Sequence, residues 1–492
     1  MVQSMTSAQQ PGDQESSIQS SRKLQLIESI EKNFDKLKDF TFFNRKFHLQ
    51  DQKYHQFLIE PHLKVLEIGC GNGNLLASVL PSMGIGIDLS PKIVSWAQKQ
   101  HPNLTFYAHD AETLLPFPKG TAFDVIIISD VIGFFDDIQH ALENLAPFCT
   151  PRTRLVISYY TKHWEVMVKI AELLRIKAPQ PPQNFLSTSD IEKIAELSGF
   201  EIIRKEYQQL IPIPLFGIDV LVNKFIATLP GIRRLCLRTY VVARPRPTYV
   251  PQDYSTTVVI PCRNEKGNIE PAVQRLPIFC KDMEIIYVEG HSKDGTWEEI
   301  LRVQKKYPHL NIKAFQQSGK GKADAVHLGF NNARGELLMI LDADLTVPPK
   351  QLPKFYKAMS TGQGEFINGT RLIYPLEEQS MRFCNFLANK GFSWIFSYLL
   401  SQRFTDTLCG TKVFLAKDYK RILEQRKFFG DFDPFGDFEL IFGASKLNMK
   451  VIEVPIRYEA RSYGTTQISR WRHGVILLRM VMHAYKKLKL FF

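Results

Sequence analysis

Runs of consecutive apolar residues alternate with longer stretches of helical periodicity twice along the chain, first from about residue 64 and again from about residue 256. Short apolar runs such as 338–341 are typical of strands that are buried on both faces, as in parallel sheets covered by helices. This alternation predicts the α/β fold class, with two domains in tandem. Between them, residues 241–255 are rich in proline, which is typical of a linker.

The length of 492 residues also favours two domains, because it exceeds what one ordinary core supports. The chain begins with a Gln- and Ser-rich stretch that resembles neither a signal peptide nor a membrane span, and no run of 18 apolar residues follows. The boundaries we predict are a disordered or helical extension over 1–44, a first domain over 45–240, a linker over 241–255, a second domain over 256–465 and a basic amphipathic helix over 466–492.

The cysteine content indicates the cellular compartment, and the charge indicates the kinds of binding partner. The seven cysteines form no CxxC pair, which argues against a zinc site or a disulfide framework and favours a reducing, cytoplasmic location. The net charge is +12, and residues 461–492 hold seven Lys or Arg and no acid. Such a tail attracts anions. Nucleic acid, anionic lipid headgroups and phosphorylated substrates are all anionic and are therefore candidate partners.

In the first half, a glycine-rich turn joins a predicted strand to a predicted helix. It contains Gly69, Gly71 and Gly73, and Glu67 lies at the end of the strand. Glycines at this position let the backbone approach a nucleotide closely, although the motif alone is weak. Asp88 ends the next predicted strand about 20 residues later, where a carboxylate binds ribose hydroxyls. The spacing predicts a nucleoside-containing cofactor.

The glycine spacing is GxGxG rather than GxGxxG, and a third strand end adds Asp110. Together, "VLEIGCGNG", "GIDLS", "HDAETLLPF" and "FDVIIISDVIGFFDDI" resemble the class I S-adenosylmethionine-dependent methyltransferases, which have a Rossmann-like fold. The resemblance implies S-adenosylmethionine as cofactor, with the methionine end lined by Glu67, Gly69, Gly71 and Gly73, the ribose by Asp88 and the adenine by Asp110. It does not indicate a methyl acceptor, and we assign no catalytic base.

In the second half, the apolar run 338–341 ends in Asp342 and Asp344. Two other predicted strands end near Glu265 and Asp294. Since ligands of open α/β sheets bind outside the carboxyl ends of the strands, we expect these acids to meet at one edge. Carboxylate oxygens at such an edge predict a site for a hard divalent cation such as Mg²⁺.

The stretches "VVIPCRNE", "VEGHSKDGT", "GKGKADAVHLGFNNARGELLMILDADL" and "TDTLCGTKVF" resemble family 2 glycosyltransferases of the GT-A fold, especially the branch that makes polyprenyl-phosphate sugars, such as dolichyl-phosphate mannosyltransferase. The resemblance implies Mg²⁺ or Mn²⁺ held by Asp344 with Asp342. The nucleotide sugar would be bound by Pro261, Glu265, Asp294, Lys322 and Asp342. The catalytic set would be Asp342, Asp344, Arg371, Arg382, Asp437 and Arg461, the arginines gripping phosphate oxygens.

The sequence differs from that branch at three places, which affect the predicted nucleobase of the sugar donor and the third metal ligand. Thr346 stands where the branch usually has a Gln, and Gly290 with His291 replaces the usual Asp-Gly. The stretch "RSYGTTQ" stands where the branch has "GESK".

The sequence leaves two kinds of sugar acceptor open. A lipid phosphate is already anionic and needs no general base, whereas a hydroxyl needs a carboxylate, for which Asp437 is the candidate beside Glu439. Residues 380–404 and the C-terminal stretch combine aromatic, aliphatic and basic residues without acids, which is typical of interfacial helices. This favours a polyprenyl phosphate acceptor.

The sequence therefore predicts a bifunctional enzyme, peripheral on the cytoplasmic face of a membrane, whose partners are a nucleotide sugar and a lipid phosphate rather than nucleic acid. The oligomeric state is unknown. The alternative is a glycosyltransferase that acts on a glycan hydroxyl and carries a non-catalytic S-adenosylmethionine-binding or pseudo-methyltransferase module.

Overall fold

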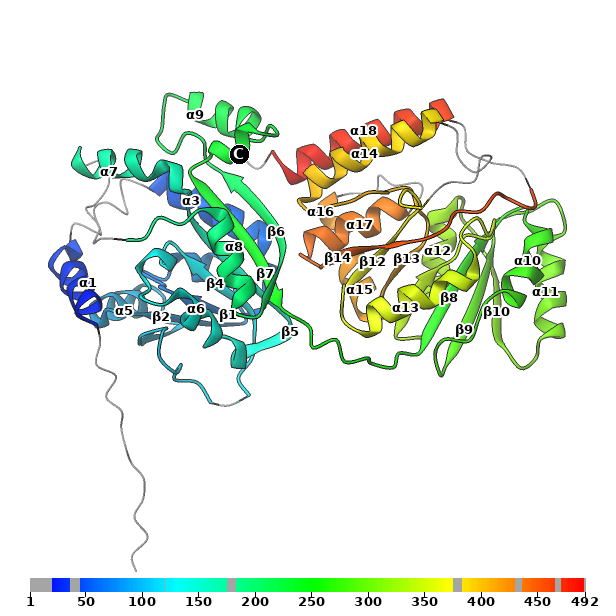
Figure 1. The fold of residues 1–492 in the computed structure, drawn as a ribbon, viewed down its shortest axis with the longest axis horizontal. Helices are drawn as coiled ribbons and strands as arrows, with labels where there is room; N and C mark the ends of the chain where they lie inside the picture. The colour runs from blue at the N-terminus through cyan, green and yellow to red at the C-terminus, as the bar shows by residue number, and fades with distance from the viewer. Residues whose placement is uncertain are drawn as a thin grey trace, which may run out of the picture.

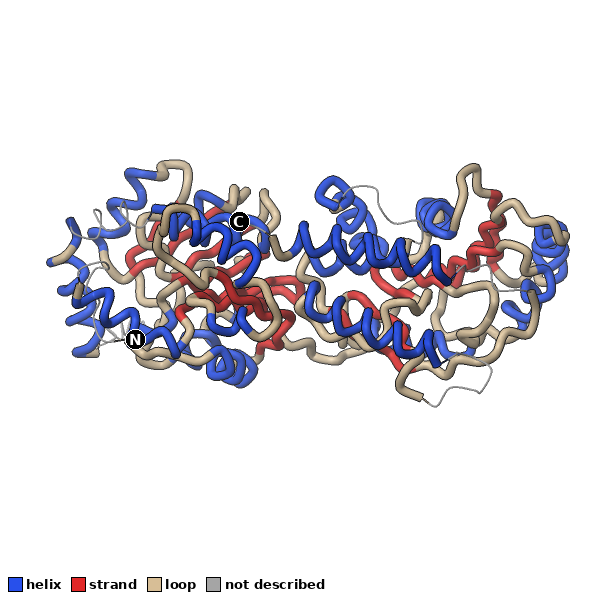
Figure 2. The backbone as a smooth tube through the Cα atoms, turned by 90° about the horizontal axis from the view of Figure 1, so that it is seen from above, coloured by secondary structure: helices blue, strands red, loops and turns tan. Residues whose placement is uncertain are grey.

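A computed structural model describes residues 20–35, 45–118, 120–174, 183–374, 383–429, 436–464 and 470–490. Within these residues the chain forms two α/β domains that lie end to end (Figure 1). Each domain contains a seven-stranded sheet. Seen from above, the strands lie mainly inside and the helices outside (Figure 2). The predicted fold class is therefore confirmed.

The first sheet has the order β3-β2-β1-β4-β5-β7-β6. The strands from β1 to β5 pair in parallel, whereas β7 pairs antiparallel with both β5 and β6. The carboxyl ends of the parallel strands therefore meet at one edge, as in other doubly wound folds. The strands are β1 (Lys64–Ile68), β2 (Met83–Asp88), β3 (Thr105–Ala108), β4 (Phe123–Ser129), β5 (Cys149–Tyr160), β6 (Phe200–Gln208) and β7 (Arg238–Pro245).

Helices cover this sheet, and local capping explains where several begin. Ser90 accepts a hydrogen bond from the backbone of Ile93 with Pro91 at the first helical position, and Ser187 forms a capping box with Asp190. The helices are α1 (Ser21–Lys32), α3 (Arg45–Leu58), α4 (Asn74–Ser78), α5 (Pro91–Gln100), α6 (Ile138–Glu143), α7 (Glu165–Leu173), α8 (Thr188–Leu197) and α9 (Ile218–Leu221), followed by the π-helix η4 (Val222–Ile226) and the 3-10 helix η5 (Ile232–Leu235).

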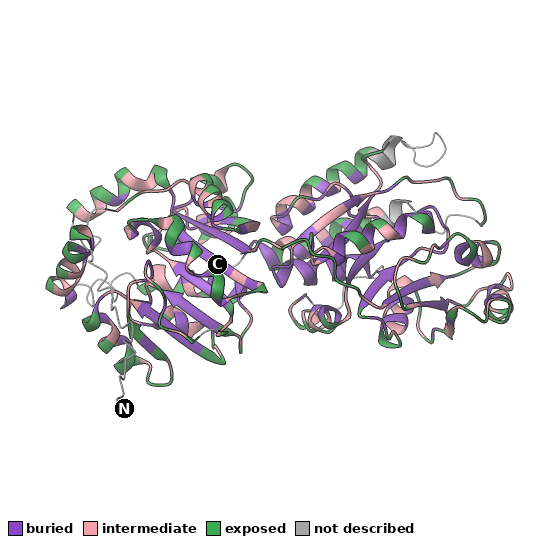
Figure 3. Cartoon of the chain, turned by 60° about the horizontal axis from the view of Figure 1, so that its bottom comes forward, coloured by how far each residue is buried: buried purple, intermediate pink, exposed green. Residues whose placement is uncertain are grey.

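The second sheet has the order β10-β9-β8-β11-β13-β12-β14. The strands β10, β9, β8 and β11 are parallel, and β13 runs antiparallel to both β11 and β12. The strands are β8 (Thr256–Cys262), β9 (Met283–Glu289), β10 (Asn311–Gln316), β11 (Leu337–Ile340), β12 (Phe366–Thr370), β13 (Lys412–Leu415) and β14 (Val451–Pro455). Its strands are mostly buried (Figure 3), as the continuous apolar runs predict.

The helices of the second half are α10 (Lys266–Gln274), α11 (Thr296–Lys306), α12 (Lys322–Asn331), α13 (Leu352–Ser360), α14 (Phe383–Leu400), α15 (Ala416–Glu424), α16 (Arg426–Phe429), α17 (Asp437–Lys446) and α18 (Arg470–Leu488). In Figure 1, α14 and α18 run side by side along the upper side of this domain, and the two helices pack against each other. Among the described residues, no helix is long and apolar enough to span a bilayer.

The linker is shorter than the sequence predicts. The sequence predicts that residues 241–245 belong to the linker, but they complete β7, which pairs with β5 up to Ala243 and with β6 up to Pro245. The run Val241–Ala243 is buried because it lies between those two strands. Proline is tolerated here because Pro245 is the last residue of the strand.

The two domains share a core and a set of buried polar contacts. One hydrophobic cluster includes Phe57 of α3 together with Met449 of the second domain. The Asn448 side chain donates a hydrogen bond to the Leu58 carbonyl at 2.6 Å, and Lys489 pairs with Glu206 at 2.6 Å. The domains are therefore packed against each other as well as joined by the linker.

Candidate active sites

The carboxyl ends of β8, β9 and β11 lie at one edge of the second sheet because the three strands are parallel. Glu265 follows β8 and Asp294 follows β9. Asp342 and Asp344 follow β11. The structure divides these acids into an Arg461-centred group and a Lys322-centred group, with Asp294 apart from both.

Arg461 bridges two of the acids. Its Nη1 lies 2.8 Å from Glu265 Oε1, and its Nη2 lies 2.7 Å from Asp344 Oδ2. Thr346 Oγ1 donates to the other oxygen of Asp344 at 2.8 Å, and Asn268 Nδ2 donates to Glu265 at 2.7 Å. Thr346, which replaces the usual Gln, thus contacts the predicted metal ligand directly. Burial raises the pKa of Glu265, although Arg461 and Asn268 oppose this shift.

Lys322, at the start of α12, bridges the other pair. Its Nζ lies 2.8 Å from Asp342 and 3.4 Å from Asp437. Lys412 approaches Asp437 from β13 at 3.9 Å. Burial alone would raise the pKa of Asp342, but the charge of Lys322, with Lys412 and Arg371, lowers it below its ordinary value. Asp342 therefore stays ionised at neutral pH.

Gly410 provides the space in which this pair meets. A Cβ at this position would lie 1.9 Å from Asp342 Oδ2 and 2.5 Å from Lys322 Nζ. Any other residue here would displace the ion pair.

Asp294 organises the turns before two helices. It accepts hydrogen bonds from the backbone of Lys266 in α10 and Thr296 in α11, both at 3.1 Å. Tyr463 donates to it at 3.3 Å. Burial opposes ionisation, but these hydrogen bonds, led by that of the Thr296 hydroxyl, lower its pKa. Asp294 therefore connects the first residues of α10 and α11.

The remaining predicted residues of this half have different surroundings. Pro261 lies in β8 opposite Val288. The Gly290 amide donates to the Cys262 carbonyl at 2.9 Å, and His291 Nε2 lies 3.0 Å from the Gly319 carbonyl oxygen.

Arg371 is bound to Asp406, a residue that sequence reasoning missed. Its Nε and Nη2 donate to the two carboxylate oxygens of Asp406 at 2.6 and 2.8 Å. Although burial opposes ionisation, Arg371 holds the pKa of Asp406 at about 2. Its guanidinium is thus paired with Asp406, while its charge still contributes to the lowered pKa of Asp342. Arg382 lies outside the described residues.

The glycine turn of the first domain adopts left-handed backbone conformations. The φ angles of Gly69, Gly71 and Gly73 are +71°, +52° and +75°. A Cβ at Gly71 would meet no atom within 4 Å, so the backbone there borders open space. Asp88 Oδ2 accepts from the Gly71 amide at 3.1 Å, which connects the turn to the end of β2.

The acidic side chains near the glycine turn of the first domain accept hydrogen bonds mainly from backbone amides. Asp88 Oδ1 accepts from the Ser90 amide at 3.1 Å, and Glu67 accepts from the Leu76 amide at 3.0 Å. Burial raises the pKa of Asp88, and that of Glu67 well above its ordinary range. Glu67 is directed at α4 rather than at open space, so it supports the glycine turn.

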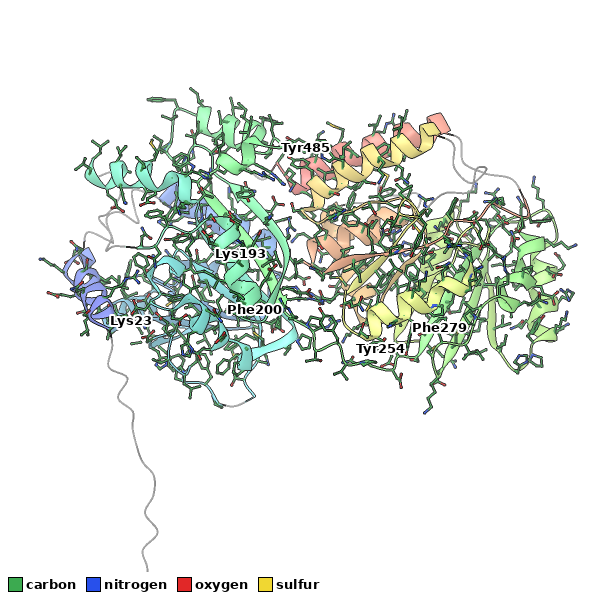
Figure 4. All side chains as sticks on the ribbon, in the orientation of Figure 1. Lys23, Lys193, Phe200, Tyr254, Phe279 and Tyr485 are labelled. Carbon is green, nitrogen blue, oxygen red and sulfur yellow. The ribbon has the colours of Figure 1, made fainter. Side chains whose placement is uncertain are left out.

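The N-terminal helix contacts the predicted adenine site. Lys23 of α1 lies 2.6 Å from Asp110 and 3.0 Å from Glu112, and Figure 4 labels Lys23 on this helix. Sequence reasoning missed this contact because Lys23 is 87 residues away from Asp110 in the chain. By contrast, a signal for Lys412 existed, since it is a lysine within the apolar run "KVFL" of a buried strand.

A cavity of about 360 Å³ lies elsewhere in the first domain. None of the predicted cofactor residues lines it. Its lining includes the basic or titratable side chains Lys162, His163, Lys205, Arg233 and Arg234.

Comparisons with known proteins agree with the two halves. Residues 31–205 match the family "Methyltransferase domain", and residues 257–423 match "Glycosyl transferase family 2". The chain therefore carries a methyltransferase domain followed by a family 2 glycosyltransferase domain. The predicted combination of these two enzyme classes is confirmed.

Among curated proteins, the chain is similar to "Dolichol-phosphate mannosyltransferase" of Pyrococcus furiosus, with 27% identity over 237 residues, which are 47% of this chain and 63% of that protein. It is also similar to the protein of the same name from Saccharomyces cerevisiae, with 33% identity over 120 residues, 23% of this chain and 44% of that one. The chain thus spans less than two thirds of either relative.

Among solved structures, a SAM-dependent methyltransferase of Thermotoga maritima, described as a possible histamine N-methyltransferase, is 16% identical. It covers 44% of this chain and 99% of its own, with a TM-score of 0.36.

Proposed function

We propose that the second domain transfers a sugar from a nucleoside-diphosphate sugar to a polyprenyl phosphate, with a divalent cation. The observation that carries this proposal is the grouping of acids and fixed cations at the carboxyl edge of β8 and β11. Glu265 and Asp344 share Arg461, and Asp342 and Asp437 share Lys322. Alternating charges of this kind suit a diphosphate with its counter-ion.

The donor set fits Mg²⁺ or Mn²⁺. Asp344 and Glu265 already bind one positive charge, that of Arg461, through carboxylate oxygens. Among the described residues, no group of three His, Cys, Asp or Glu side chains is arranged to hold a metal. Mg²⁺ is commonly held by one or two carboxylates together with substrate phosphates, so the cation is expected to bind with the nucleotide.

Within this proposal each side chain has a distinct task. Asp344, with Asp342 nearby, would hold the cation, which supplies positive charge to the departing diphosphate. Lys322 keeps Asp342 ionised and correctly placed. With Asp344 bound to a cation, Arg461 would no longer pair with that carboxylate. Its guanidinium would then donate two parallel hydrogen bonds to phosphate oxygens.

A phosphate acceptor suits Asp437 better than a hydroxyl does. The Asp437 carboxylate lies near two lysines, Lys322 at 3.4 Å and Lys412 at 3.9 Å. These two lysines make the surroundings of Asp437 positively charged, which attracts an anionic acceptor more strongly than a neutral hydroxyl. An acceptor that is already anionic has no proton to remove. The names of the two curated relatives point to the same acceptor class.

We propose that the first domain binds S-adenosylmethionine and transfers its methyl group. Gly71 would border the cofactor and Asp88 would accept hydrogen bonds from the ribose hydroxyls. The free space beside Gly71 and the lone pairs that Asp88 retains fit such a ligand. Asp110 would meet the adenine in competition with Lys23.

The test uses the full chain with Mg²⁺, labelled UDP- or GDP-sugars and a polyprenyl phosphate dissolved in detergent. Label is expected in the lipid product with one donor class, and chelation of the cation is expected to abolish it. Label on a soluble glycan but never on lipid would overturn the acceptor assignment. Labelled S-adenosylmethionine, supplied with the glycolipid product and with soluble sugars, distinguishes methyl transfer from binding without turnover.

A further inference from the structure

The methyltransferase domain has an apolar surface segment, residues 213–235, that comprises α9, η4, η5 and their flanking turns. Phe216 has an exposed fraction of 106%, which is that of a fully exposed side chain. Ile218 and Leu221 are 58% and 60% exposed, and Phe225 is 47% exposed. Contiguous exposure of large apolar side chains marks an interaction surface rather than ordinary protein surface.

The exposed charge of this segment is basic. Its basic residues are Lys224, Arg233 and Arg234, and Arg234 is exposed. Its acidic residue, Asp219, is buried and paired with Lys46. The exposed charge around the apolar residues is therefore basic, which complements an anionic surface.

The segment continues into the helices of the glycosyltransferase domain. The Thr228 Oγ1 and Tyr485 OH atoms are 2.9 Å apart, and the Tyr398 hydroxyl donates to the Thr228 carbonyl. These contacts join the segment to α18 and α14. Figure 1 shows α9, α14 and α18 along one side of the molecule, and Figure 4 labels Tyr485 on that side.

Exposed apolar side chains recur on these two helices. Trp394 of α14 is 66% exposed, and Leu478 and Met482 of α18 are 56% exposed each. The sequences of α14 and α18 contain no Asp or Glu. Both domains therefore carry exposed apolar residues with basic neighbours on elements that lie along one side of the molecule.

We propose that residues 213–235 form, with α14 and α18, one face that docks on an anionic phospholipid bilayer, with Phe216 inserted into the headgroup region. Apolar residues framed by Lys and Arg are the pattern of interfacial membrane binding. The inference rests on the proposed function only in that a polyprenyl phosphate resides in a membrane. Its new element is that the methyltransferase domain itself is an anchor.

The test measures flotation of the full chain with vesicles of phosphatidylcholine, alone or mixed with phosphatidylglycerol, without any nucleotide sugar. Phe216→Ser is expected to lower the affinity for mixed vesicles by about tenfold or more, the loss for one buried aromatic side chain. Ile278→Ser is the matched control, because Ile278 is 76% exposed and its neighbour Phe279 is labelled on the opposite side in Figure 4. Equal flotation of Phe216→Ser and wild type would overturn the proposal.

A second variant tests how much basic charge contributes to vesicle binding. Arg234→Gln is expected to weaken binding to the anionic vesicles by about fivefold, the effect of one basic residue near a charged surface, and to leave binding to neutral vesicles unchanged. If the face instead covers a second copy of the chain, light scattering without vesicles would show a dimer that Phe216→Ser dissociates, and the proposal would fall.

Failure of this inference differs from failure of the proposed function. Sugar transfer to detergent-dissolved lipid without vesicle binding would remove the docking face and leave the enzyme. If the chain binds vesicles, Phe216→Ser abolishes this binding, and no sugar is transferred, the docking face would stand and the proposed glycosyltransferase activity would fall.

Discussion

Asp88 and Asp342 occupy equivalent places in the two domains, each at the carboxyl end of a parallel strand, yet their charge environments are opposite. Asp88 accepts from the amides of Gly71 and Ser90, and burial raises its pKa. Asp342 is also desolvated, but Lys322 lowers its pKa. The strand position fixes where an acid lies, and its partner fixes how readily it ionises.

This difference fits the ligands we propose for each site. Backbone amides leave lone pairs of Asp88 available to neutral ribose hydroxyls. In the second domain the charge of Lys322 keeps Asp342 ionised, as a site for a cation and a diphosphate requires. The predictions below test this contrast in order of decreasing effect.

The largest effect is expected when a cation partner is removed from a fully buried acid. Arg371→Met should destabilise the second domain by about 3–5 kcal/mol, because it leaves Asp406 buried without its ion pair. Urea unfolding followed by circular dichroism measures this, with the exposed Arg334→Met as control.

The same pair has a pH signature. The pKa of Asp406 is about 2 in the folded protein, below its unfolded value of about 3.9. Its contribution to stability is therefore present above the unfolded value and is lost as pH falls through about 2. A variant as stable as the wild type at pH 7 would contradict this account.

Asp344→Asn should reduce sugar transfer by about 10²- to 10³-fold, the usual cost of removing one preorganised electrostatic contact. The affinity for S-adenosylmethionine should not change, because Asp344 belongs to the other domain. Initial rates and calorimetry measure the two effects. Asp253→Asn, at an exposed position in the linker, should change neither.

Asp88→Asn should weaken S-adenosylmethionine binding by about 10- to 100-fold, since hydrogen bonds to a charged group contribute about 1.5–3 kcal/mol. Sugar transfer should stay at the wild-type rate. Isothermal titration calorimetry provides the dissociation constant, and Asp124→Asn serves as an exposed control. Equal losses in both activities would mean that the substitution acts through folding.

The smallest effect concerns pH. Because the pKa of Asp88 is raised, S-adenosylmethionine binding should weaken as pH falls through a value above that of an ordinary Asp. Because the pKa of Asp342 is lowered, nucleotide binding should persist to lower pH. Titrations of both ligands across the acidic range would show the two midpoints in this order, and the reverse order would contradict the comparison.

Apolar runs and glycine turns predicted the two sheets and the strand ends that bear Asp88 and Asp342, because these features depend on neighbours in sequence. The partners were harder to predict. Lys23 reaches Asp110 from 87 residues away, and Arg371 is held by Asp406 rather than left open. The predicted start of the linker, residue 241, was too early because β7 continues to Pro245, where a proline is tolerated at the end of the strand.

The most direct test of the central claim is the binding of Mn²⁺, followed by electron paramagnetic resonance of the free ion, with and without UDP or GDP. We predict that the nucleotide strengthens Mn²⁺ binding in the wild type and that Asp344→Asn removes this enhancement. Mn²⁺ binding that is indifferent to both the nucleotide and the substitution would contradict the assignment of the metal site.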